Sequence, residues 1–146
     1  MRLSLQEAQR LIALALDHAE QYNRPVTIAV VDAGGFLVSL QRQDGARPMT
    51  PSIATSKAYS AAVMGRPANL LKPWAESEPV FFSQVARMGM YPIVPSDGAV
   101  TIKRDGEILG GIGVSGGRPE EDHAICEAAL TAAGFELDFE NWGTRR

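Results

Sequence analysis

The sequence predicts a single α/β domain in which helices cover an antiparallel sheet. Two pairs of apolar runs are each joined by a tight turn, which is the pattern of β-hairpins, and the strands of a hairpin are antiparallel. Segments with helical periodicity lie before, between and after these pairs. A chain of 146 residues is long enough for one hydrophobic core, so we expect residues 1–146 to form one layered domain.

The first helix is predicted by a capping box at its start. Ser4 can accept a hydrogen bond from the amide three residues later, and Glu7 can reach back to the amide of Ser4. Pro25, with Asn23 and Arg24 before it, ends the helical pattern. The apolar residues between them recur at helical spacing: Leu5, Ala8, Ile12, Ala15, Leu16 and Ala19.

The first hairpin is predicted over residues 26–42. VTIAVV (26–31) is uncharged and rich in β-branched residues, which favours a buried strand. DAGG (32–35) is a turn sequence, and FLVSLQR (36–42) is the expected return strand.

A second helix is expected to begin at Thr50, as an N-cap with Pro51 in the first helical position, and to end near Gly65. Five prolines divide the following segment, 66–97, into short helical or irregular pieces. We expect this segment to cover the core, to close over a ligand or to form an oligomer surface. Its large apolar residues are Trp74, Phe81, Phe82, Met88, Met90 and Tyr91.

The second hairpin is predicted over residues 99–114. Its strands, 99–103 and 107–114, flank Asp105-Gly106, which is the favoured pair for a type I′ turn. Pro119 then opens a last helix that Gly134 ends. The remaining tail carries Phe135, Phe139 and Trp142.

The composition indicates a protein without a nucleic-acid or membrane partner. The net charge is −3, which disfavours binding to polyanions. The single cysteine, Cys126, excludes an internal disulfide. The start of the chain does not read as a signal peptide, and no apolar run approaches the ~20 residues of a membrane-spanning helix, so we expect a cytoplasmic protein.

The stretch GGIGVSGG (110–117) contains both G-x-G-x-x-G and G-x-S-x-G. A dinucleotide fingerprint requires a parallel βαβ unit, whereas these glycines lie in a hairpin strand before a helix whose first turn holds three carboxylates. A hydrolase nucleophile elbow requires serine, acid and histidine in that order from a parallel sheet, whereas Asp122 and His123 are neighbours on one helix. We therefore reject both motifs.

The strand period offers another explanation for the glycines. Leu109, Gly111, Gly113 and Ser115 share one strand face, which is almost without side chains. Glycine in a strand indicates that something approaches the backbone closely. We consider two candidates: a flat ligand, and the second helix, whose small residues are Ala54, Ala58, Ala61 and Ala62.

Four polar residues are candidates for chemistry. Lys57 lies between the small residues of the second helix, so its ammonium reaches solvent or meets a carboxylate or an anionic ligand. Asp32 either caps its own turn or acts as a base, with Lys57 as a possible partner. His123 is a candidate ligand or acid–base group, and His18 is expected to be structural. Two distant histidines make no metal site, although haem iron needs only one or two ligands such as His, Met or Tyr.

Three stretches resemble the GlcG/HbpS family, the DUF336 or haem-degrading-domain group, which is similar to the C-terminal domain of PduO-type proteins. These stretches are VTIAVVDAGGFLVSLQRQDGA (26–46), IATSKAYSAAVMG (53–65) and DGEILGGIGVSGGRPEEDHAICEAAL (105–130). Many relatives have histidine after the double glycine, where this chain has Phe36. The matching motif positions are Asp32, Gly34, Gly35, Arg42, Asp44, Gly45, Lys57, Gly111, Gly113, Ser115, Gly116 and Asp122.

The resemblance implies a profilin-like α/β fold with about five antiparallel strands, assembly into homo-oligomers, and binding of a small organic ligand with haem as the leading candidate. We expect the ligand to contact Lys57, Gly111, Gly113, Ser115 and His123, beneath aromatic residues of the 74–91 segment. The alternative is a cofactor-independent isomerase, lyase or hydratase of a catabolic pathway, acting on a small carboxylate or oxygenated metabolite. Its acid–base groups would be Asp32, Lys57 and His123. A purely structural subunit is a third possibility.

Overall fold

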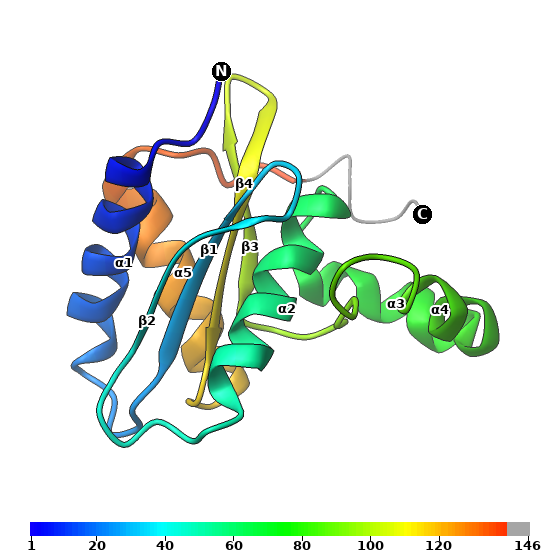
Figure 1. Cartoon of the computed structure of the whole chain (residues 1–146), viewed down its shortest axis with the longest axis horizontal. Coiled ribbons are helices and arrows are strands. Elements are labelled where there is room, and N and C mark those ends of the chain that lie inside the picture. Colours follow the sequence, from blue (N-terminus) through cyan, green and yellow to red (C-terminus); the bar gives the residue numbers. More distant parts are fainter. Residues whose placement is uncertain (140–146) are drawn as a thin grey trace.

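A four-stranded antiparallel sheet of order β2-β1-β4-β3 separates two layers of helices in this computed structural model, which describes residues 1–139 (Figure 1). Helices α1 and α5 cover one face, and α2 covers the other. In chain order the elements are α1 (Leu5–Ala19), β1 (Thr27–Asp32), β2 (Leu37–Arg42), α2 (Thr50–Val63), the 3₁₀ turn η1 (Ala68–Leu71), α3 (Lys72–Ser77), α4 (Pro79–Val85), β3 (Ala99–Arg104), β4 (Glu107–Ser115) and α5 (Pro119–Ala133).

The expected α/β class and antiparallel pairing are confirmed, but the number of strands differs. Both hairpins form, and in the second turn Asp105 and Gly106 both have positive φ, as a type I′ turn requires. The two hairpins supply all four strands of the described residues, so the expectation of about five strands is wrong there. Between α2 and β3 the proline-divided segment forms η1, α3 and α4 and adds no strand.

The start of α1 agrees with the predicted capping box. The Ser4 hydroxyl accepts a hydrogen bond from the Glu7 amide at 3.0 Å, and the Glu7 carboxylate accepts one from the Ser4 amide at 3.1 Å. The helix then buries its apolar stripe against α5 and the sheet, through Ala8, Leu11, Ile12, Ala15 and Ala19.

The start of α2 differs from the prediction. Thr50 is the first helical residue and not its N-cap. Its hydroxyl donates a hydrogen bond to the Arg47 carbonyl at 2.7 Å and lies 2.8 Å from the hydroxyl of Thr27 on β1. The side chain therefore ties the helix to the sheet instead of capping a free amide.

Helices α3 and α4 form an arm that extends from the body of the domain beyond α2 (Figure 1). A small apolar cluster joins the arm to α2 through the buried side chains of Tyr59, Leu71, Phe82 and Ile93. Several large apolar side chains of the arm and of the segment after it remain exposed: Val80, Phe81, Met88 and Met90. Among the described residues, no helix combines the length and apolar character needed to cross a membrane. Trp142, expected in the tail, lies outside the described residues.

Candidate functional site

Helix α2 itself occupies the face of β4 that lacks side chains. A Cβ atom added at Gly111 would lie 2.3 Å from the Ala58 carbonyl oxygen, and one at Gly113 would lie 2.3 Å from the Ala54 carbonyl oxygen. Both distances are far shorter than a van der Waals contact, so the glycines allow helix and strand backbones to touch. Of the two explanations for this face, helix packing is therefore correct, and a flat ligand does not fit against Gly111 and Gly113.

Lys57 projects from the edge of this contact into the protein. Its side chain is only 8% exposed, and its ammonium donates a hydrogen bond to the Val114 carbonyl at 2.8 Å. The Asp122 carboxylate, from the first turn of α5, lies 3.6 Å from the same nitrogen. Lys57 thus connects α2, β4 and α5 within the protein.

Because Gly98 and Gly117 have no side chains, the Lys57–Asp122 ion pair has room between them. A Cβ at Gly98 would lie 2.9 Å from the Lys57 ammonium, and one at Gly117 would lie 2.7 Å from a carboxylate oxygen of Asp122. Burial raises the pKa of the Asp122 carboxyl, while the Lys57 charge and a 3.0 Å hydrogen bond from the Gly117 amide act in the opposite direction. The sequence supplied Asp122 as a motif position, but its pairing with Lys57 is visible only in the structure.

Asp32 lies at the opposite end of the sheet from this pair. Its carboxylate accepts hydrogen bonds at 3.0 Å from the amides of Gly34 and Phe36, which stabilises the turn between β1 and β2. Asp32 faces Gly110, whereas Val114 faces Ile28, four residues back along β1. Four residues of strand correspond to roughly 13 Å. The expected pairing of Asp32 with Lys57 is therefore wrong.

Ser115 and His123 are the sequence neighbours of the two residues that Lys57 contacts, Val114 and Asp122. Ser115 is buried at the end of β4, opposite Thr27. His123 is 22% exposed on α5, with one ring nitrogen 3.5 Å from the Glu127 carboxylate, and its Nδ1 is buried without a hydrogen-bond partner among the described residues. His18 stacks edge-on against Tyr22, as a structural histidine would. Because Asp32 lies at the opposite end of the sheet from Lys57 and accepts hydrogen bonds within its own turn, the expected acid–base set of Asp32, Lys57 and His123 does not form as one site.

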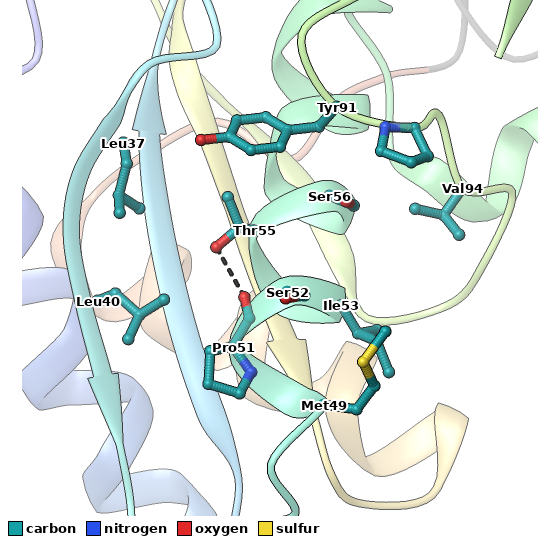
Figure 2. Close-up of a pocket in the computed structure, with 11 residues that line it drawn as sticks. Leu37, Leu40, Met49, Pro51, Ser52, Ile53, Thr55, Ser56, Tyr91 and Val94 are labelled. Carbon is teal, nitrogen blue, oxygen red and sulfur yellow. Dashed lines mark hydrogen bonds between the residues drawn. The ribbon is translucent and has the colours of Figure 1, made fainter. Parts of the chain in front are cut away.

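A groove with a volume of about 590 Å³ lies between α2, β2 and the segment at residues 91–94 (Figure 2). Figure 2 shows the Tyr91 ring across one end of the groove, with its hydroxyl toward Leu37, and Met49 at the opposite end beside Ile53. The lining residues are mainly apolar: Leu37, Leu40, Met49, Pro51, Ser52, Ile53, Thr55, Ser56, Tyr91, Pro92 and Val94.

Of the four side-chain hydroxyls on the groove lining, those of Ser52, Thr55, Ser56 and Tyr91, only the Thr55 hydroxyl has a hydrogen bond within the described residues. The Thr55 hydroxyl donates a hydrogen bond to the Pro51 carbonyl at 2.7 Å, within the helix. The Tyr91 hydroxyl has no hydrogen bond within residues 1–139. No set of three or more His, Cys, Asp or Glu side chains in the described part of the chain could hold a bare metal ion. The groove therefore suits a flat, apolar ligand better than a small ion.

The sequence did not indicate this groove, although Tyr91 stands among the large apolar residues of the 66–97 segment. Leu37 and Leu40 on β2 lie outside the main core, but this is visible only in the structure. The groove itself is formed by three segments separated in sequence, so no local pattern reveals it.

Comparison with known proteins gives consistent matches. Residues 3–131 match the model of a family described as "Haem degrading protein HbpS-like". The chain is 33% identical over 114 residues to protein GlcG of Escherichia coli K12, covering 77% of this chain and 81% of GlcG. It is also 32% identical over 132 residues to the corrinoid adenosyltransferase PduO of Citrobacter freundii.

The match to PduO covers 90% of this chain but only 39% of PduO, so the chain spans about two fifths of that protein. Among solved structures, a PduOC:heme complex superposes with a TM-score of 0.84 at 26% identity, covering 93% of this chain and 98% of that chain. The sequence and the fold therefore give the same relationship.

Proposed function

The chain belongs to the HbpS-like family, and from this premise we propose that it binds haem in the groove between β2 and α2. The observation that carries the proposal is a mainly apolar groove of about 590 Å³ that is open to a ligand, in a chain that shares its fold with a PduOC:heme complex. Pockets for small molecules typically measure ~300–1,000 Å³ and are lined mainly by apolar side chains.

The lining residues are compatible with a porphyrin. Leu37 and Leu40 from β2 and Ile53 from α2 offer apolar surface for the flat ring. Met49 and Tyr91, at opposite ends of the groove, are of the residue types that can bind haem iron. Bound haem would supply a redox-active iron, while the protein would supply apolar burial and a ligand atom.

A haem titration of the purified protein tests this proposal. We expect the Soret absorption to shift and to saturate at one haem per chain. The variant Ser56→Trp places an indole on the groove wall and is expected to weaken binding by at least tenfold, whereas Thr131→Trp adds the same ring to an exposed position of α5 and is the control. Absence of a Soret shift in the unmodified protein would exclude haem as the ligand, and equal binding by both variants would exclude this groove.

We also propose that the protein is a homo-oligomer whose copies meet at the arm. Val80 and Met88 are 76% and 74% exposed, and Phe81 and Met90 lie near them in the sequence and are about half exposed. Apolar side chains gathered in this way favour burial against a partner. Light scattering during size-exclusion chromatography should give a mass above that of one chain, and the double variant Val80→Glu/Met88→Glu should lower it. A wild-type mass of one chain would refute the proposal.

A further inference from the structure

The groove contains very few atoms that could bind iron. Its lining includes neither histidine, because His18 lies on α1 and His123 on α5, and Cys126 is buried in the core. Apart from aliphatic hydroxyls, the candidates are the phenol of Tyr91 and the thioether of Met49.

The Tyr91 ring is held firmly in place. It packs edge-on against Tyr59, with ring centroids 5.4 Å apart and an interplanar angle of 78°. The backbone that follows it is fixed by a 3.0 Å hydrogen bond from the Ile93 amide to the Ala86 carbonyl and a 2.8 Å bond from the Val94 amide to the Ser60 hydroxyl. A ligand atom on a fixed ring loses little conformational entropy when it binds.

The hydroxyl of Tyr91 is free, unlike that of its neighbour. The Tyr59 hydroxyl accepts a hydrogen bond from the Met90 amide at 3.1 Å and its side chain is buried. The Tyr91 hydroxyl has no hydrogen bond within residues 1–139, and it points across the groove toward Leu37 (Figure 2). Of these two phenols, only that of Tyr91 is available to a ligand in the groove.

Met49 is the weaker candidate. Its side chain is 64% exposed at the start of α2, and a methionine has three rotatable bonds to fix. A thioether is also a soft ligand, whereas a phenolate oxygen is hard and suits ferric iron better.

We propose that the Tyr91 phenolate oxygen is the protein ligand of ferric haem iron, an inference that rests on the proposed function. The Oη–iron bond forms as the phenol O–H bond breaks, and the proton is released to solvent without any change in oxidation state.

The test compares the wild type with Tyr91→Phe, Met49→Leu and Tyr22→Phe after addition of ferric haem. Tyr22→Phe removes a phenol outside the groove and is the matched control. We expect resonance Raman bands of an iron-bound phenolate in the wild type, in Met49→Leu and in Tyr22→Phe, and their loss in Tyr91→Phe. Haem affinity of Tyr91→Phe should fall by about tenfold to a hundredfold or more, as expected when a metal site loses a supporting group or ligand.

The outcomes separate the two proposals. If Tyr91→Phe binds haem with the wild-type spectrum, the ligand assignment is overturned while haem binding stands. Loss of the wild-type spectrum in Met49→Leu alone also overturns it. If the wild type takes up no haem, both proposals fail. A circular dichroism spectrum and a thermal melt of Tyr91→Phe, which keeps the aromatic ring, establish that any loss does not come from unfolding.

Discussion

Replacement of Gly113 by alanine is the most direct test of how α2 packs on the sheet. The added Cβ would lie 2.3 Å from the Ala54 carbonyl oxygen and 2.6 Å from the Ala58 amide nitrogen, where an ordinary contact begins at 3.4 Å. Since 3.4 − 2.3 = 1.1, helix and strand must separate by about 1 Å. Both opposing atoms belong to the backbone, so no side-chain rotation relieves the clash.

The size and the sign of the effect follow from this geometry. Overpacking a filled core costs ~1–3 kcal/mol, and a clash with rigid backbone should reach the upper part of that range. Without the clash, alanine in place of glycine would stabilise an extended strand by ~0.4–1 kcal/mol, because the unfolded chain loses conformational freedom. The two explanations of the glycine therefore predict opposite signs.

Urea unfolding, followed by circular dichroism, measures the difference in free energy of unfolding between wild type and Gly113→Ala. Gly106→Ala is the control, because its Cβ meets no atom within 4 Å and only its positive φ of 76° opposes the substitution. We expect a loss of about 3 kcal/mol for Gly113→Ala and ~1–2 kcal/mol for the control. A Gly113→Ala protein as stable as wild type would refute the packing explanation.

Three further predictions concern electrostatics and capping. Lys57→Met leaves the buried Asp122 carboxylate without its partner, so urea unfolding should show a loss of ~3–5 kcal/mol in the free energy of unfolding. A loss below ~1 kcal/mol would mean that the Lys57–Asp122 ion pair does not stabilise the fold. Burial raises the pKa of the Asp122 carboxyl above 3.8, so the folded protein binds this proton more tightly than the unfolded chain does. The carboxyl therefore contributes most to stability below pH 3.8, and its contribution falls as the pH rises through the folded-state pKa. The stability difference between wild type and Asp122→Asn, measured at a series of pH values, should therefore decrease with rising pH, and an increase would show that the Lys57 charge outweighs burial. Ser4→Ala removes the acceptor of the Glu7 amide and should cost ~1 kcal/mol in a thermal or urea melt, whereas an unchanged stability would contradict the role of the cap.

Much of the fold follows from local patterns. The Ser4–Glu7 capping box and the Asp105-Gly106 turn appear in the structure as predicted, because caps and tight turns depend on residues only a few positions apart. The strand period likewise identified the face of β4 that lacks side chains, with Gly111 and Gly113 on it. The family, too, was recognisable from the same stretches.

The candidate site was much less predictable. Asp32 and Lys57 both stand next to motifs that suggested a common pocket, yet strand register separates them along β1 by four residues. The actual partner of Lys57 is Asp122, 65 positions further along the chain. Tyr91 lies in a segment whose irregular sequence gave no orientation for any side chain.

The sequence by itself determined the three long helices, the two hairpins with their antiparallel pairing, the bare strand face and the family. Only the tertiary structure decided what fills that face, which carboxylate neutralises Lys57 and where an apolar groove opens. The physical reason is that periodicity, caps and turns depend on neighbouring residues. Contacts between layers depend instead on the register of β1 against β4 and on the rotation of α2, which packing of the whole core sets at once.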